Sequence, residues 1–250
     1  MAETLAQVLL DTVKNYPKPD FMLYKKEGRY VPISTEEFGQ NVKFFCLGVR
    51  ELRLTKGDKV VILSENRPEW VMADMANLCL GAITVPIYTT LVPEQIKYII
   101  DDSDAKAVIL SNLEQWQKVA GISPALAKVR HYITLMETAP EGALTFKQVQ
   151  EQGKKRDAES PGLFEQLALQ VKPEDEASLI YTSGTTGFPK GVILTHSNFL
   201  SNIKTSVPLL EFTTTDTVLS HLPLSHVFER MVTFACIYVG CHIGYAESLE

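Results

Sequence analysis

Short apolar runs rich in β-branched residues alternate with longer segments of helical character, and this alternation limits the possible folds more than any other feature of the chain. The apolar runs predict buried strands at residues 59–63, 83–88, 107–110, 132–135 and 177–181. Strands that alternate with helices of this length form parallel sheets whose faces are covered by the helices. The predicted fold class is therefore α/β.

Capping and breaking residues mark where several helices begin and end. Ser34 and Glu37 form a capping box, and the segment after them has a single apolar face. Pro68 favours the first turn of a second helix, which Gly81 ends. Other helices are predicted at residues 5–13, 93–100, 197–207 and 227–239.

A polar connection is expected at about residues 152–162, which are charged and end in Pro-Gly. Its basic run, residues 154–156, is short and lies beside Asp157 and Glu159. We interpret it as part of a solvated linker rather than as a patch that binds nucleic acid. Apart from this connection, residues 1–250 are expected to form one incomplete domain.

The overall charge restricts the partners of the chain. With 24 Lys and Arg against 30 Asp and Glu, the formal net charge is −6, which argues against binding of nucleic acid through a general basic field. An anionic substrate must therefore be met by local groups. No run approaches the roughly 18 apolar residues of a membrane span, and a secretory signal is not recognisable.

The cysteines and histidines do not suggest a metal centre. Four cysteines are scattered along the chain, and none form a C-x-x-C pair. The simplest explanation is a cytosolic protein with reduced thiols. His221, His226 and His242 lie near Cys236 and Cys241, but without the close ligand pairs of a zinc site. We expect these residues to pack in or near a core. The expected location is cytoplasmic or peripheral to a membrane, and a homodimer is left open.

A run of hydroxyls and glycines at residues 181–192 (YTSGTTGFPKGV) follows the strand predicted at 177–181. Gly184 and Gly187 let the backbone approach a ligand closely, and successive N–H groups in such a turn form a concave site for an anion. Lys190 adds a positive charge. Four hydroxyls add donors, from Thr182, Ser183, Thr185 and Thr186. The composition predicts a polyphosphate as the ligand.

The run differs from the common phosphate-binding loops. A P-loop has two glycines five residues apart, followed directly by Lys-Ser or Lys-Thr; here Gly184 and Gly187 are three apart, and Gly191 follows Lys190. The kinase pattern Gly-x-Gly-x-x-Gly does not fit either. The plain alternative is a surface turn rich in Ser, Thr and Gly between two strands.

The run and its continuation ILTHSN at residues 193–198 resemble the signature loop of the adenylate-forming superfamily. Three further segments are similar to acyl-CoA synthetases that act on long fatty acids, namely SENRPEW at 64–70, GA with VPIYTT at 81–90, and LPLSHVFER at 222–230. The resemblance covers nearly the whole chain and is closest to the long-chain fatty acid–CoA ligase branch.

The resemblance implies the first part of a large N-terminal AMP-binding domain. Later motifs of the family are not present in the chain: a Tyr-Gly-x-Thr-Glu segment, an Asp that binds ribose, and the lysine of the C-terminal domain. We therefore expect an incomplete N-terminal portion that lacks the C-terminal domain and is inactive alone. A non-catalytic module that binds nucleotide weakly or dimerises is the alternative, and the sequence of the parent gene beyond Glu250 would distinguish the two.

The activity implied by the resemblance has two steps. A fatty acid carboxylate attacks the α-phosphorus of ATP to give acyl-adenylate and pyrophosphate, and coenzyme A then forms the thioester and releases AMP. In the family the loop contacts the β- and γ-phosphates, which assigns that role to Thr182, Ser183, Gly184, Thr185, Thr186, Gly187 and Lys190. Thr182 is also assigned as a ligand of Mg²⁺, the implied metal cofactor, and Lys190 is a candidate catalytic residue.

His226 is the second candidate catalytic residue. It precedes a predicted helix, and in the family a histidine at this place borders the acyl and adenylate pocket. Its plain alternative is a cap on the helix or a core residue. Arg230 lies one turn later on the same face and is assigned to the same pocket, although some relatives carry an aromatic gate there. His196 is expected to help start a helix, and Trp70 and Tyr88 are expected in the core.

Overall fold

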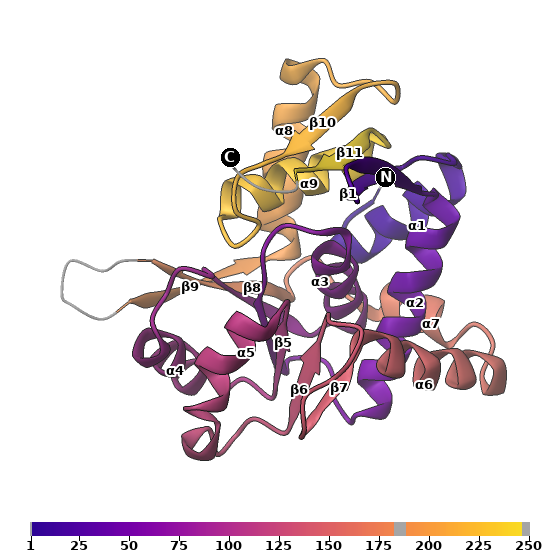
Figure 1. Ribbon diagram of the computed structural model, residues 1–250. Coiled ribbons are helices and arrows are strands. Elements are labelled where there is room, and N and C mark those ends of the chain that lie inside the picture. Colours follow the sequence, from indigo (N-terminus) through magenta and orange to yellow (C-terminus); the bar gives the residue numbers. More distant parts are fainter. Residues whose placement is uncertain (1, 183–188, 247–250) are drawn as a thin grey trace.

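Two sheets with helices around them make up the computed structural model, which describes residues 2–182 and 189–246 (Figure 1). The larger sheet has the strand order β7-β6-β5-β3-β4-β8-β9 within these residues. Its strands are β3 (Lys59–Leu63), β4 (Ile83–Ile87), β5 (Ala107–Leu110), β6 (His131–Thr134), β7 (Ala143–Thr145), β8 (Glu176–Thr182) and β9 (Lys190–Thr195). The smaller sheet, of order β10-β11-β1-β2, consists of β1 (Met22–Lys26), β2 (Arg29–Ile33), β10 (Thr217–Ser220) and β11 (His242–Tyr245).

The helices occupy the connections between strands, as the alternating pattern predicts. They are α1 (Leu5–Asn15), α2 (Thr35–Glu51), α3 (Pro68–Leu80), α4 (Pro93–Asp102), α5 (Leu113–Ala120), α6 (Phe146–Glu159), α7 (Leu163–Gln170), α8 (His196–Leu210) and α9 (Val227–Val239), with a 3₁₀ turn at Ser123–Ala125. All pairs in the large sheet are parallel except β8–β9. In the small sheet β1 and β2 form an antiparallel hairpin. The predicted α/β class is confirmed.

The central strands of the large sheet are buried on both faces. Val60 and Ile62 of β3 belong to the core beneath α1, α2 and α3, whereas Val61 and Leu63 belong to a second core that also contains Ile99 of α4. Successive side chains of a strand point to opposite faces, so continuous burial requires helices on both sides. This is why β3 reads as an uninterrupted apolar run.

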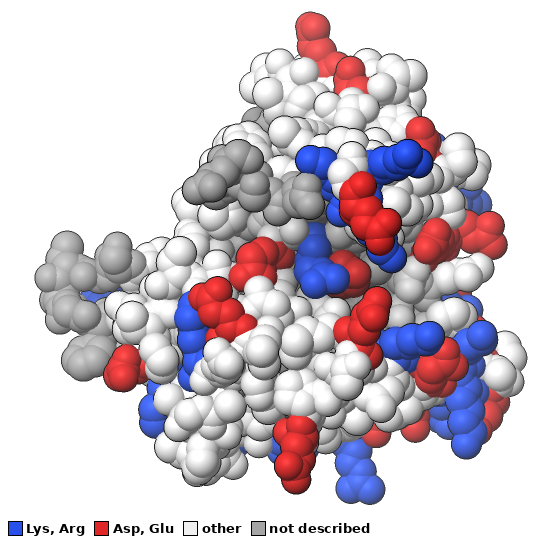
Figure 2. Space-filling model, in the orientation of Figure 1, with Lys and Arg blue, Asp and Glu red and all other residues white. Residues whose placement is uncertain are grey.

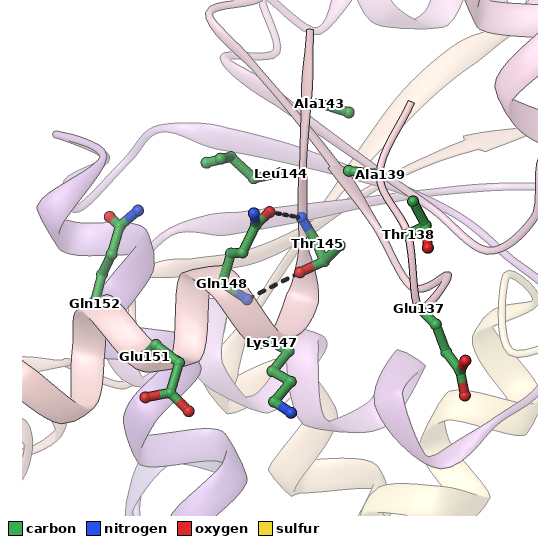
Figure 3. A pocket seen from close by; sticks show the side chains of 10 residues that line it. All are labelled: Glu137, Thr138, Ala139, Ala143, Leu144, Thr145, Lys147, Gln148, Glu151 and Gln152. Atoms are coloured by element: carbon green, nitrogen blue, oxygen red, sulfur yellow. Dashed lines mark hydrogen bonds between the residues drawn. The ribbon is translucent and has the colours of Figure 1, made fainter. Parts of the chain in front are cut away.

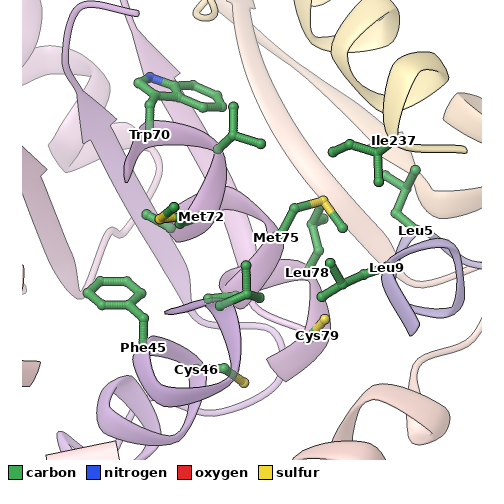
Figure 4. Packing of buried hydrophobic residues seen from close by; sticks show 14 of the residues in the cluster. Leu5, Leu9, Phe45, Cys46, Trp70, Met72, Met75, Leu78, Cys79 and Ile237 are labelled. Atoms are coloured by element: carbon green, nitrogen blue, oxygen red, sulfur yellow. The ribbon is translucent and has the colours of Figure 1, made fainter. Parts of the chain in front are cut away.

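Helix α3 lies at the centre of the larger core and is buried at nearly every position. A helix that is apolar all round has to be enclosed by other elements, and α1, α2, α7 and α9 enclose this one (Figure 4). Pro68 and Gly81 bound it as predicted, with Gly81 in the left-handed conformation at φ 75°. The side chains of α3 in Figure 4 include Trp70, Met72, Met75, Leu78 and Cys79, which meet Phe45, Cys46, Leu5, Leu9 and Ile237 of the neighbouring helices.

The prediction of an exposed connection at residues 152–162 is wrong for most of these residues, because helix α6 continues to Glu159. Thr145 and Gln148 exchange two hydrogen bonds of 3.0 and 2.7 Å that cap this helix (Figure 3). Gly153 then lets α6 approach α2 closely, since a Cβ there would lie 1.7 Å from the Phe44 carbonyl oxygen. The polar residues are the solvent face of a packed helix.

His196 joins α8 to the N-terminus of the chain. Its ring is fully buried, and Nδ1 accepts a hydrogen bond of 3.2 Å from the backbone N–H of Leu5. Burial lowers the pKa of His196 to about 4, outweighing the opposing effect of Asp175. The ring is therefore neutral in the folded protein at neutral pH. His196 does begin α8, as expected, but its side chain serves the core.

We expect His196 to make folding sensitive to acid. Its folded pKa lies below the unfolded value of 6.5, so the unfolded state binds the proton first and stability falls as pH drops from 6.5 toward 4. A shift of this size corresponds to about 3 kcal/mol. Urea unfolding of the wild type and His196→Gln between pH 7.5 and 4.5 measures it, with the exposed His221→Gln as control. A pH dependence unchanged in His196→Gln would contradict this role.

Candidate functional site

A cavity of about 380 Å³ lies where β4 and β8 end. Its walls come from Pro86–Tyr88 at the end of β4, from residues 180–182 at the end of β8, from α4, and from His226 at the start of α9. Ligands of parallel α/β sheets bind outside the carboxyl ends of the strands, which makes this cavity the candidate site. The larger open hollow of Figure 3, about 720 Å³, lies beside α6, and its Thr145 and Gln148 side chains are used in the helix cap.

Three residues of the hydroxyl- and glycine-rich run, Tyr181, Thr182 and Pro189, line this cavity. Thr182 and Lys190 are directly opposite each other in the antiparallel β8–β9 pair, so their side chains leave the same face of the sheet. Thr182 lines the cavity, and both residues are exposed. The Lys190 side chain therefore starts beside a residue of the cavity wall. The other candidate phosphate contacts lie outside the described residues, at Ser183, Gly184, Thr185, Thr186 and Gly187.

Tyr181 holds the end of β8 in place. Its hydroxyl donates a hydrogen bond of 2.6 Å to the Asp102 carboxylate, and burial followed by the nearby carboxylate raises its pKa far above the ordinary value. The phenol is therefore a permanent donor. Across the pair, Gly191 admits this packing, because a Cβ there would lie 2.8 Å from Leu179 Cδ1 and 3.3 Å from Tyr181 Cζ.

His226 caps α9 and lines the cavity at the same time. Its Nδ1 accepts a hydrogen bond of 3.2 Å from the backbone N–H of Phe228, which in the neutral ring places the proton on Nε2. The ring is exposed and borders the cavity together with Val227. The structure thus brings His226 and Thr182 to one cavity. His226 also caps α9, so the two expected positions of this residue occur together.

The position of Arg230 corrects the expectation that it lines the acyl pocket. Its guanidinium is fully buried one turn deeper in α9, where α3 and β8 cover it, and it is not among the cavity residues. It forms two hydrogen bonds of 3.0 and 2.8 Å with Asp74 and one of 2.6 Å with Ser178 Oγ. Arg230 is therefore a structural residue that fixes α9 beneath the site.

Sequence reasoning missed two residues at the site. Tyr88, expected in the core, is half-buried and lines the cavity. Asn66 directs the segment that leads to His226: its amide donates to Leu222 O at 2.6 Å and to Ser220 Oγ at 3.1 Å, and its oxygen accepts from Leu224 N at 2.8 Å. Both segments, residues 64–70 and 222–230, carry the family resemblance and could have been singled out from the sequence. That they contact each other is visible only in the folded chain.

Charges are mixed on the surface that Figure 2 shows, where Lys and Arg lie among Asp and Glu. An anionic ligand there would meet individual side chains rather than a broad positive field. Within the described residues, no group of three His, Cys, Asp or Glu could hold a metal ion. Over the same residues, no helix combines the length and the apolar character that crossing a membrane requires.

The comparison with protein families decides the classification. The chain matches the family of AMP-binding enzymes over residues 9–250. It belongs to that family. The predicted family is therefore confirmed, and the curated relatives are long-chain fatty acid–CoA ligases, as the resemblance indicated.

Three similar proteins illustrate the match. The chain is 31% identical to long-chain-fatty-acid–CoA ligase FadD15 of Mycobacterium bovis, covering 93% of this chain and 38% of the relative. It is 31% identical to long-chain-fatty-acid–CoA ligase 5 of Mus musculus, covering 90% and 34%. The inhibitor-bound N-terminal domain of FACL13 from Mycobacterium tuberculosis has the same fold, with a TM-score of 0.83, 20% identity, and coverage of 100% and 58%. The chain thus spans little more than a third of these curated relatives.

Asn66 supplies the first test of the site geometry. Asn66→Ala removes three hydrogen bonds to residues 220–224, so we expect the free energy of unfolding to fall by about 2 kcal/mol. Amide exchange should become faster in this segment. Asn66→Asp should behave similarly, because a carboxylate oxygen then faces Leu222 O.

Asn202→Ala is the matched control, since Asn202 is exposed and donates to Asn198 O of its own helix α8. Urea unfolding and hydrogen exchange by mass spectrometry compare the variants. Unchanged exchange at residues 220–226 in both Asn66 variants would show that this side chain does not hold the segment.

Proposed function

We propose that the protein carrying this chain activates a long-chain fatty acid with ATP, forming acyl-adenylate and then acyl-CoA. The observation that carries the proposal is that Lys190 lies directly opposite Thr182, which lines a cavity together with His226. The names of the curated relatives support the substrate class. Family membership supports the nucleotide.

The first step joins two anions, so the catalyst must reduce their repulsion. Catalysis of such chemistry is mostly positioning and charge stabilisation. Lys190 is proposed to pair with the departing pyrophosphate, because it is exposed and lies directly opposite Thr182 of the cavity wall. Thr182 is proposed to contribute a hydroxyl to the same phosphates. His226 is proposed to donate its Nε2–H to an oxygen of the acyl or adenylate group.

The cavity walls suit the start of an acyl chain. Ile87, Leu91, Ile99, Ile180 and Val227 contribute apolar surface to it. Ligand cavities of this kind combine apolar walls with a few polar groups that fix orientation. Here Thr182 and His226 are such groups, so the carboxylate end of the acid is proposed to lie toward them.

Magnesium fits the site only in part. Mg²⁺ takes oxygen ligands and retains several waters, and the Thr182 hydroxyl is one suitable oxygen at the cavity. When bound, the ion would offset phosphate charge.

Coenzyme A is proposed as the second acceptor of the acyl group. The four buried free cysteines support a reducing, cytoplasmic location.

Lys190→Ala tests the proposal most directly. In the full-length protein, fatty acid-dependent ATP–pyrophosphate exchange should fall about 100-fold, as when one preorganised group is removed from a developing charge. Stability should change by less than about 0.5 kcal/mol, because Lys190 is exposed. Lys147→Ala, at an exposed position on α6, is the control. Exchange that Lys190→Ala leaves intact would remove Lys190 from the mechanism.

The wild type decides between the proposal and its alternative. A full-length protein that binds ATP yet catalyses no exchange with any fatty acid would be a non-catalytic nucleotide-binding module. Gel filtration with light scattering on the same sample determines whether it forms a homodimer.

A further inference from the structure

Helix α4 contacts the chain at the end of β8 and again just before the start of β9. In Figure 1 this helix lies beside the hairpin. Tyr98 and Asp102 are four residues apart on α4, so they share one face of the helix. One contacts the residue just before β9, and the other contacts the end of β8.

The contact just before β9 is made by Tyr98. Its hydroxyl donates a hydrogen bond of 3.3 Å to the carbonyl oxygen of Pro189. Proline has no backbone N–H, so this carbonyl is the only hydrogen-bonding group of Pro189. The next residue is Lys190. A bond to Pro189 therefore restrains the backbone from which the Lys190 side chain leaves.

The contact with β8 is made by Asp102. Its carboxylate accepts the hydrogen bond of 2.6 Å from Tyr181, the residue before Thr182. The rings of Tyr98 and Tyr181 also meet edge to face, with centroids 6.5 Å apart. The two contacts are thus joined, and each lies one residue from a candidate phosphate-binding side chain.

The helix is itself fixed, which makes it a suitable support. Ile96, Ile99 and Ile100 are buried in the smaller core against β3, β4 and β5. Ile99 also borders the cavity. Displacement of α4 would therefore disturb the core of the large sheet. Tyr98 and Asp102 lie outside this core, Tyr98 half-buried and Asp102 exposed.

We propose that Tyr98 and Asp102 are positioning residues, which hold Lys190 and Thr182 in register with the cavity so that both meet the phosphates of the nucleotide. We refer to this pair as the α4 anchor. The proposal rests on the proposed function, since it assigns the anchor to the ATP side of the site. Tyr181 and Pro189 also line the cavity, but the anchor contacts their hydroxyl and carbonyl groups, one residue from Thr182 and Lys190.

Four substitutions in the full-length protein test the anchor. Tyr98→Phe removes the neutral hydrogen bond to Pro189, the longer of the two described above, so KM for ATP should rise about threefold. Asp102→Ala removes a bond to a charged acceptor, and KM for ATP should rise about tenfold. Asp102→Asn retains an acceptor oxygen and should restore most of the loss. Asp101→Ala, the neighbouring residue that pairs with Lys97 at the surface, is the control for position.

The kinetic result that supports the anchor is selective. KM for ATP rises in ATP–pyrophosphate exchange while KM for the fatty acid stays within twofold. Tyr132→Phe, which removes a hydroxyl from a half-buried tyrosine packed on Trp116, leaves both unchanged. Equal changes in the two KM values, no change in either, or failure of Asp102→Asn to recover would each overturn the proposal.

Hydrogen exchange separates failure of the anchor from failure of the proposed function. The amides of residues 190–192 should exchange faster in Tyr98→Phe and Asp102→Ala than in the wild type, Asp101→Ala or Tyr132→Phe. If the wild type catalyses no ATP–pyrophosphate exchange, the proposed function fails, and calorimetric titration with ATP replaces KM as the second readout. Unchanged exchange at residues 190–192 in both variants would overturn the anchor whatever the activity.

Discussion

The ion pair between Arg230 and Asp74 is the interaction on which the arrangement of the two sheets depends. Both side chains are essentially without solvent contact, with exposed fractions of 0% and 1%. Removing two charges from water is expensive, and only excellent geometry repays that cost. Here the pairing is bidentate, Ser178 accepts a third hydrogen bond, and three aromatic rings surround the guanidinium at 5.4–5.6 Å.

This pair connects elements that are far apart in the sequence and that together carry the site. Asp74 lies on α3, Ser178 on β8 and Arg230 on α9, which packs beside the small sheet. Ser178 also donates to the carbonyl of Thr84 on β4 at 2.8 Å. The strands β4 and β8 end at the cavity, and α9 begins directly after His226. The charge pair thus fixes the elements that carry the cavity residues: Arg230 lies one helical turn after His226, and Ser178 lies a few residues before Thr182.

The sequence was sufficient to predict an element where a local signal and a buried face agreed. Helix α3 is an example, because Pro68 begins it and Gly81 ends it. The sequence was insufficient where long-range contacts decide. The β1–β2 hairpin was missed because its turn is polar and its strands are largely exposed, yet β1 pairs with β11 at the other end of the chain. Arg230 was assigned to a pocket because no pattern reveals that a carboxylate on α3 lies opposite it. Asn66, which holds the segment before His226, was missed for the same reason.

A double-mutant cycle on Arg230 and Asp74 measures how strongly the two buried charges stabilise each other. Arg230→Met, Asp74→Ala and the double variant are compared with the wild type by urea unfolding at pH 7. We expect each single change to cost about 3–5 kcal/mol, because it leaves a buried charge unpaired. The double variant should cost about 2–3 kcal/mol less than the sum, as for residues in direct contact. Additive effects would show that the two charges do not stabilise each other and that this pair does not hold α9 against α3.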